Sequence, residues 1–395
     1  MTRTLKKAIS LVLVMTLACL LSIPAFADNS RPNSEIGSSG MKNPQINSTI
    51  SYISEEDAAL LANQCIRNQI SIGDHCPWSQ TTKIFETVAL FDFEDNINAY
   101  LFRLAANGKR DGYVFINASL EAPCVEAFGY DCDFMLDAML LKNHKPKAAT
   151  KDHIIYAHGL TFLSQDKDGN YFYIEDKTNK LNENKQELVK IYENDRQKEI
   201  DADSQSNLAE LKSKSIKPLN QIIYHQHDAN GIWSSGYTIY TTDDFSSPDN
   251  CAPTAGTNLV YYWSHKGSPR ESNLWTGRVF VDLYRDMKTC AGTGTSSADV
   301  IPGLEEFARS RNVSTPISDY EGADWNSITD YLYHDRPIII FVYKDRKYKN
   351  HAILGVGFQD TSNGYYIRVA DGWTRTFSNF YKFPSYISFQ ITVWW

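Results

Sequence analysis

The stretch from residue 337 to residue 373 constrains the fold most, because three β-forming runs follow one another closely in it. Residues 337–343 form a nearly continuous apolar run that starts with a proline, a pattern typical of a central strand. Residues 349–358 and 365–373 are two further runs, and the short loop between them contains Asn363-Gly364. Two such runs around a short Asn-Gly loop predict a β-hairpin, and therefore antiparallel strands.

The hairpin also predicts which side chains meet at its end. If its loop is centred between Thr361 and Ser362, antiparallel pairing sets His351 opposite residue 372, or opposite Asp371 with a half-step shift in register. A neighbouring carboxylate orients a histidine ring and stabilises its protonated form, as a general base requires. The pattern therefore predicts that His351 and Asp371 are neighbours. The alternative for a lone histidine is an ordinary core or surface residue.

Cys251 stands at the predicted start of a helix. Pro253 suits the first helical turn, and Leu259, Val260 and Trp263 recur at helical spacing. Unpaired main-chain N–H groups and the helix dipole favour a thiolate at this end of a helix. Cys251 is therefore a candidate nucleophile, and the alternative is a structural cysteine or half of a disulfide. The order of Cys251, His351 and Asp371 along the chain is that of a Cys-His-Asp triad.

Length and charge limit the class of protein. The chain has 395 residues, of which 42% are hydrophobic, enough for about two domains with linkers. Its net charge is −8, and no long block of Lys and Arg occurs beyond the N-terminus, so nucleic acid is a poor partner. No C-x-x-C or H-E-x-x-H motif occurs, so we expect neither a metal site nor a cofactor.

The first 27 residues read as a signal peptide. Three basic residues precede an apolar run over residues 9–23, and Ala25-Phe26-Ala27 supplies small residues for cleavage. We therefore expect a secreted protein, extracellular or on the cell surface of a bacterium, without stable membrane insertion after signal removal. The alternatives are an uncleaved membrane anchor and lipidation at Cys19.

Four of the remaining six cysteines lie in the N-terminal half. Their spacing allows disulfides Cys65–Cys76 and Cys124–Cys132, although other pairings remain open. Cys251 and Cys290 would then form one disulfide or stay as two thiols.

Composition changes divide the chain into five parts. Residues 28–51 are predicted to be a flexible leader, 52–175 an α+β module, 176–215 a charged helical linker open to cleavage, and 216–395 a second module. Periodicity predicts helices at 55–69, 134–141, 300–311 and 324–332, and strands at 83–91, 99–104, 112–116, 153–156, 171–174 and 237–240.

The second module resembles a known family. Residues 250–255, with Cys-x-Pro-Thr-Ala at the helix start, Tyr262-Trp263, residues 350–357 and Val369-Ala370-Asp371 are similar to the papain-like cysteine peptidases related to the double-glycine leader peptidases. Residues 100–116 and 128–130 resemble the propeptide of streptopain-like secreted proteases.

The resemblance implies an α+β fold: a papain-like catalytic domain, with a helical side packed on a twisted antiparallel sheet, preceded by an α+β pro-domain. It implies Cys251 as nucleophile, His351 as base and Asp371 as orienter, with a peptide or protein as substrate and the chain's own N-terminal pro-domain as partner. Papain-like enzymes usually carry a Gln several residues before the nucleophile, and residues 243–250 contain none. Asn250 is therefore the predicted oxyanion donor, together with the main-chain N–H of Cys251.

Two other functions stay open, and the missing Gln favours the first of them. One is a catalytically silent extracellular binding protein on the same fold, and the other is a cell-wall amidase or transpeptidase that keeps the triad.

Overall fold

The computed structural model describes residues 52–394 with internal gaps. The gaps are residues 73–75, 120–123, 143–152, 159–160, 175, 182–183, 191–222, 230, 233–236, 267–270, 315, 323, 343–350, 362–363 and 384–386. The predicted signal peptide 1–27, the leader 28–51 and most of the predicted linker lie outside the described residues. The chain from Ile50 onward forms one compact unit, whose described part follows.

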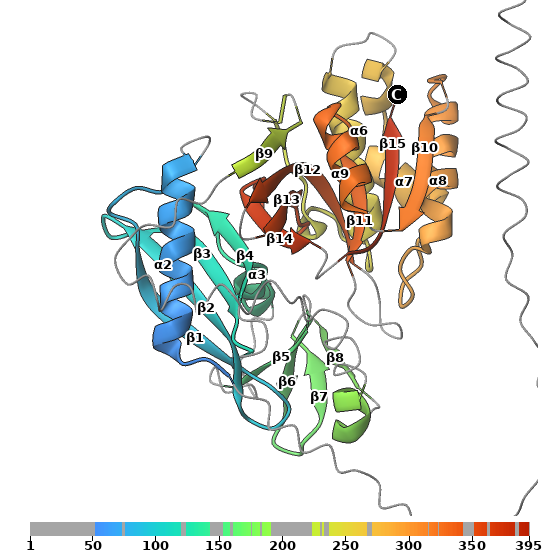
Figure 1. The fold of residues 1–395 in the computed structure, drawn as a ribbon. Helices are drawn as coiled ribbons and strands as arrows, with labels where there is room; N and C mark the ends of the chain where they lie inside the picture. Colours follow the sequence, from blue (N-terminus) through green and yellow to red (C-terminus); the bar gives the residue numbers. More distant parts are fainter. Residues whose placement is uncertain are drawn as a thin grey trace, which may run out of the picture. The chain divides into compact units, whose positions relative to one another are not determined.

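The N-terminal half, whose described part lies within residues 52–190, begins with a helix on a four-stranded meander (Figure 1). Helix α2 spans Glu55–Ile72, and the Ser54 side chain caps it by accepting a hydrogen bond from the Asp57 N–H, 3.2 Å. The meander's strands are β1 (Lys83–Phe91), β2 (Ile97–Ala106), β3 (Lys109–Asn117) and β4 (Cys124–Tyr130). Asn107 and Gly108 both adopt positive φ at the β2–β3 turn, as a two-residue hairpin requires. The predicted helix and three of these strands are thus confirmed.

Helix α3 (Met135–Lys142) follows, and four antiparallel strands then extend the sheet. These strands are β5 (Ile154–His158), β6 (Thr161–Gln165), β7 (Tyr171–Tyr173) and β8 (Asp176–Lys180). Residues 185–190 are helical, and Leu181 and Leu188 are buried in one apolar cluster with Phe93 and Tyr171. The folded part of this half therefore continues beyond residue 175, where the sequence predicted a linker to begin.

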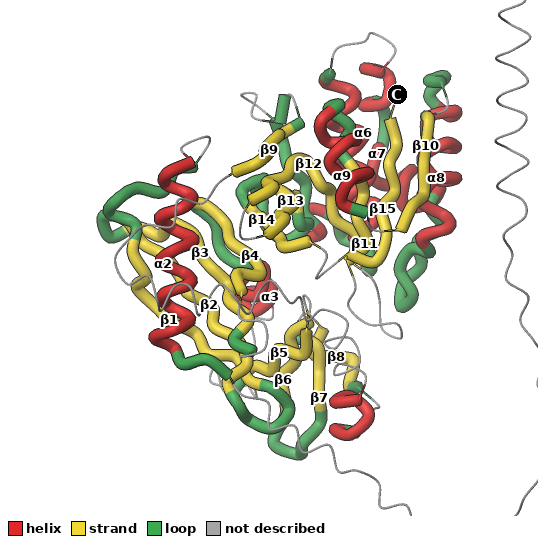
Figure 2. The backbone as a smooth tube through the Cα atoms, in the orientation of Figure 1, coloured by secondary structure: helices red, strands yellow, loops and turns green. Residues whose placement is uncertain are grey.

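The C-terminal half places helices on both faces of a sheet (Figures 1 and 2). Its helices are α6 (Cys251–His265), α7 (Val279–Asp286), α8 (Ser297–Ser310) and α9 (Trp325–Tyr333), with short 3-10 turns η1 (Thr242–Asp244) and η2 (Glu271–Trp275). Its strands are β9 (Ile223–Asp228), β10 (Ile317–Gly322), β11 (Ile338–Val342), β12 (His351–Thr361), β13 (Gly364–Ala370), β14 (Asn379–Phe383) and β15 (Ile387–Trp394).

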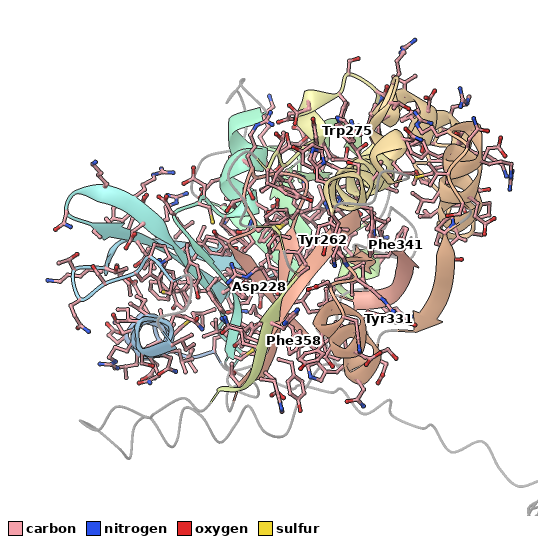
Figure 3. The ribbon with its side chains drawn as sticks, turned by 90° about the horizontal axis from the view of Figure 1, so that it is seen from above. Asp228, Tyr262, Trp275, Tyr331, Phe341 and Phe358 are labelled. Carbon is pink, nitrogen blue, oxygen red and sulfur yellow. The ribbon has the colours of Figure 1, made fainter. Side chains whose placement is uncertain are left out.

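Strand β11 shows why its sequence is continuously apolar. Ile338, Ile340 and Val342 belong to the same apolar cluster as Ile328 and Leu332 of α9. Ile339 and Phe341 belong instead to the cluster that contains residues of α6, α7 and α8. Figure 3 labels two members of this cluster, Tyr262 of α6 and Phe341. All five β11 residues are buried, because successive side chains of a strand point to opposite faces and both faces are covered.

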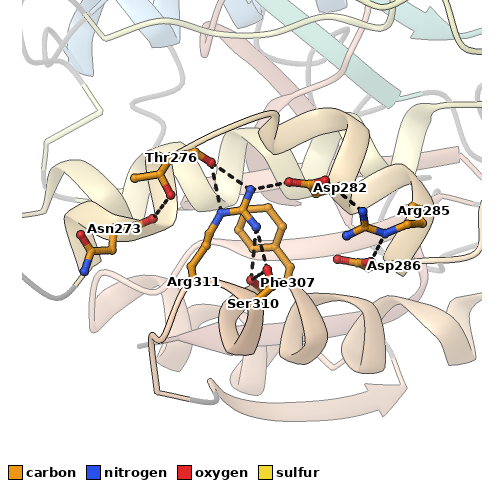
Figure 4. A network of polar contacts seen from close by, with 8 residues as sticks. All are labelled: Asn273, Thr276, Asp282, Arg285, Asp286, Phe307, Ser310 and Arg311. Atoms are coloured by element: carbon orange, nitrogen blue, oxygen red, sulfur yellow. Dashed lines mark hydrogen bonds and ion pairs between the residues drawn. The ribbon is translucent and has the colours of Figure 1, made fainter.

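A polar network joins helices α7 and α8 (Figure 4). The Arg311 guanidinium binds Asp282 of α7, 2.8 Å, and donates to the main-chain oxygen of Thr276, 2.9 Å, while its plane lies over the Phe307 ring. The network fixes the end of α8 against α7.

One sheet runs through both halves. In the described residues the strand order is β10-β15-β11-β12-β13-β14-β4-β3-β2-β1-β5-β6-β7-β8, and β9 pairs with β12. The junction is antiparallel pairing of β14 with β4, in which Asn379, Phe380 and Tyr381 lie opposite Gly129, Phe128 and Ala127. The two modules that the sequence predicted are therefore joined through their sheets.

The structure differs from the sequence analysis at one predicted strand and at the two disulfides that the cysteine spacing allowed. Residues 237–240 are not a strand, because the Tyr240 main chain bonds to the Asn258 side chain of α6 instead of to a neighbouring strand, N–H to Oδ1 2.8 Å and Nδ2 to O 2.9 Å. Cys124 and Cys132 are not paired, since strand β4 separates them by about 20 Å and a disulfide needs Cα atoms within about 7 Å. Cys65 and Cys76 are also thiols.

The Asn258 contacts predict a stability effect. Asn258 is fully buried, so Asn258→Ala leaves the Tyr240 main-chain groups without their amide partner, and we expect unfolding to become easier by about 2–3 kcal/mol. Urea unfolding measures the change. The matched control is Asn63→Ala in α2, whose amide also bonds one main-chain oxygen but is exposed. Equal midpoints for the two variants would contradict the interpretation.

Candidate active site

Cys251 is the first residue of α6, as the sequence predicted, and its side chain is partly buried. The next thirteen residues, from Ala252 to Ser264, are all buried, so α6 is a central helix enclosed by the C-terminal half. Cys251 thus stands at the N-terminal end of α6, where the Thr254 N–H donates to the Asn250 main-chain oxygen, 2.9 Å, and Pro253 carries no N–H. This end of α6 therefore carries the partial positive charge of a helix N-terminus.

Asn250 holds the loop that precedes Cys251. Its Nδ2 lies 3.0 Å from the main-chain oxygen of Thr242, 3.3 Å from that of Phe245 and 2.8 Å from that of Ser247. The residue is buried, and its two amide hydrogens are directed at these three carbonyls. An oxyanion role for this amide, which the sequence predicted, would require it to leave them.

Two contacts that the sequence did not predict fix the residues just before Asn250. Asp249 adopts φ +52° and accepts a hydrogen bond from the main-chain N–H of Gly292, 2.6 Å. The Tyr284 hydroxyl donates to the main-chain oxygen of Pro248, 3.0 Å. The approach to the helix start is therefore attached to α7 and to the loop after it, which also carries the exposed Cys290.

His351 begins strand β12 and is held on two sides. Its ring stacks on Trp373 with centroids 3.7 Å apart and planes 19° from parallel. Its Nε2 lies 2.7 Å from the main-chain oxygen of Asp371. Because a carbonyl can only accept, Nε2 carries the hydrogen in this contact, and Nδ1 is the nitrogen that can take up a proton in the neutral ring.

The Asp371 carboxylate organises the turn after β13. Its Oδ1 accepts from the N–H groups of Trp373 and Thr374 and from the Thr374 hydroxyl, at 2.9, 2.8 and 3.0 Å. Its Oδ2 accepts from Asn379 Nδ2, 3.1 Å, and from the Tyr381 hydroxyl, 3.2 Å. Burial raises the pKa of Asp371, and the hydrogen bonds from Thr374 and Trp373 oppose that rise. Asp371 thus reaches His351 through its carbonyl, while its carboxylate fixes Trp373.

The hairpin register explains this geometry. Thr361 pairs with Gly364, so the loop is centred one residue later than the sequence suggested. A bulge between Gly355 and Gly357 then shifts the pairing, and Leu354 lies opposite Ala370. Continued to the strand end, this register sets residue 373 opposite His351, which agrees with the stacking of the two rings.

Thr242 connects the surroundings of Cys251 and His351. Its main-chain oxygen accepts from Asn250, the residue before Cys251, and its N–H donates to the main-chain oxygen of Gly372, 2.8 Å. A Cβ on Gly372 would lie 3.7 Å from both His351 Nε2 and Thr242 Cγ2, which shows how closely the three residues approach. Thr242 therefore links the residue before Cys251 to the residue after Asp371.

In the part of the chain that the structure describes, no group of three or more His, Cys, Asp or Glu side chains could hold a metal ion. None of the helices described is long and apolar enough to cross a membrane.

Taken together, a mixed α/β fold with a curled sheet and a cysteine at the start of a central helix is consistent with an α+β papain-like fold. Residues 219–394 match the model of the Peptidase C39 like family, and this range includes Cys251, His351 and Asp371. The match supports a relationship of the C-terminal half to C39-type cysteine peptidases, which are hydrolases. No curated protein matches the chain. The resemblance of the N-terminal half to streptopain-like propeptides lies outside the matched range and stays a prediction.

The contacts of Asn250 predict a structural cost. Asn250→Ala leaves three main-chain carbonyls without their amide donor, and we expect the free energy of unfolding to fall by about 2 kcal/mol, measured by urea unfolding. The exposed Asn273→Ala, on the same side of the sheet, should change it by less than about 0.5 kcal/mol. A lower turnover with an unchanged unfolding midpoint would instead indicate that Asn250 serves the reaction alone.

Proposed function

We propose that the protein is an exported cysteine peptidase that hydrolyses peptide bonds with Cys251, His351 and Asp371. The observation that carries the proposal is the fixed ring of His351. Trp373 stacks on it and the Asp371 carbonyl binds Nε2, so Nδ1 is the proton acceptor. The Thr242 main chain bonds to Gly372, which follows Asp371, and to Asn250, which precedes Cys251 at the start of α6.

In the proposed reaction, His351 Nδ1 takes the thiol proton as Cys251 Sγ attacks the carbonyl carbon of a peptide bond. The C–N bond then breaks, the amine leaves with the proton from His351, and an acyl thioester remains on Cys251. Water attacks the thioester with His351 again as base, which releases the acid and restores the thiol. The main-chain N–H of Cys251, at the start of α6, is the candidate donor to the oxyanion, because the Asn250 amide is directed at its own loop.

Export and processing complete the proposal. The support for export is the basic, apolar and small-residue pattern of residues 1–27, and the support for a zymogen is the charged segment within 176–215, a natural place for cleavage between two folded halves. Such a protein would take peptides or proteins as substrates outside the cell.

Inhibitor labelling tests the nucleophile. A thiol-directed peptidase inhibitor should abolish peptide hydrolysis and attach to Cys251, and Cys251→Ala should lower kcat/KM by about a thousandfold or more, because the covalent step is lost. Peptide mapping by mass spectrometry locates the label. Cys290→Ala, which removes the exposed thiol, should keep both activity and inhibition.

Hydrolysis that survives in Cys251→Ala would remove this residue from the role. Absence of hydrolysis in the wild type would favour the silent binding protein. Capture of an added amine in place of water would favour the transpeptidase.

A further inference from the structure

We propose that the N-terminal half is a permanent part of the active structure, and that Tyr113 in it is a positioning residue for Asp371 and His351. Cleavage between the halves would then leave a two-chain protein and would not release an independent C-terminal domain. The positioning role rests on the proposed peptidase function, whereas the permanent association does not depend on it.

The main chain gives the first argument. Strand β14 uses one edge to pair with β13 and the other to pair with β4 of the N-terminal half. The pairing is extended by a hydrogen bond from the Tyr130 N–H to the main-chain oxygen of Ser378, 3.2 Å. Removal of the N-terminal half would therefore expose main-chain donors and acceptors along β14, next to the turn that carries Asp371.

The apolar core gives the second argument. Phe128 of β4 stacks on Phe380 of β14, with centroids 4.6 Å apart and planes 11° from parallel, and Tyr366 of β13 meets Phe128 edge-on. All three side chains are buried. The Tyr366 hydroxyl also donates to the main-chain oxygen of Val125, 3.2 Å. A surface that buries aromatic residues from both sides resembles the interior of a domain more than the interface of a temporary inhibitor.

A buried chain of hydrogen bonds gives the third argument. The Tyr113 hydroxyl and the Cys132 thiol both donate to Asn379 Oδ1, at 3.0 and 3.2 Å. Asn379 Nδ2 donates to Asp371 Oδ2, 3.1 Å, and to the Thr374 hydroxyl, 2.7 Å. Because both donors of the N-terminal half meet Oδ1, the Asn379 amide group must turn Nδ2 toward the Asp371 carboxylate.

This chain of hydrogen bonds supports the candidate site from outside it. It ends on the carboxylate of Asp371, whereas His351 is held by the Asp371 carbonyl and by Trp373. Tyr113, Asn379 and Asp371 are each at most 1% exposed, so water cannot replace a lost partner freely. Loss of the Tyr113 hydroxyl should loosen the turn that places the His351 ring.

The first experiment tests association without using activity. A specific protease site is placed between residues 195 and 215 of the full chain, the chain is cleaved, and the product is run on size exclusion under native conditions. We expect both fragments to elute together at the size of the uncut protein and to separate only in denaturant. Elution of a folded C-terminal fragment by itself would overturn the proposal, even if that fragment is an active peptidase.

The second experiment tests positioning. Tyr113→Phe should lower kcat for peptide hydrolysis about tenfold with KM unchanged, because the hydroxyl touches the support of His351 and no substrate. The matched control is Tyr130→Phe, which also removes a buried hydroxyl bonded to an amide oxygen, that of Gln69. It should shift the urea midpoint by a similar amount and keep kcat. Equal kcat values for the two variants would overturn the positioning role.

The two experiments separate the failure of this inference from failure of the proposed function. Co-eluting fragments without any hydrolysis by the wild type would preserve the association and remove the peptidase. An active C-terminal fragment that elutes by itself would preserve the peptidase and remove the association.

Discussion

The buried carboxylate of Asp371 is the group on which the arrangement of the candidate site depends. A charge taken out of water is costly unless hydrogen bonds replace its hydration, and this carboxylate accepts five, from the turn that follows it and from strand β14. Those bonds set the path of residues 371–374. The same path aims the Asp371 carbonyl at His351 and places Trp373 under the ring.

The second constraint is the burial of α6. A helix enclosed by other elements cannot shift to suit its first residue, so the loop before it must be shaped to meet it. Asn250 and Asp249 shape that loop by binding three carbonyls and the Gly292 N–H, and Thr242 joins it to Gly372 beside the histidine. The position of Cys251 is therefore fixed by polar contacts of its neighbours as well as by the helix.

Much of the fold could be predicted because local sequence patterns specify many of its helices and strands. The apolar positions of α2 and α6, the β-rich runs of β1 and β11, and the hairpin of β12 and β13 each have a period or a turn that neighbouring residues display. Strands β4 and β14 were not predicted. Their pairing depends on residues about 250 positions apart, and no local pattern encodes which edge meets which. The strand predicted at residues 237–240 failed for the same reason, since a side chain of α6 takes its hydrogen bonds.

The sequence by itself determined that Cys251 begins a helix, that His351 and Asp371 stand at one end of a hairpin, and that no long basic block accompanies them, because composition and periodicity are local properties. The tertiary structure decided which atoms meet. The Asp371 carbonyl, and not its carboxylate, binds His351, because a bulge at Gly355–Gly357 resets the register and burial commits the carboxylate to its own turn. It also decided that the two halves share one sheet, since a strand edge gains its partner only after the chain has folded back on itself.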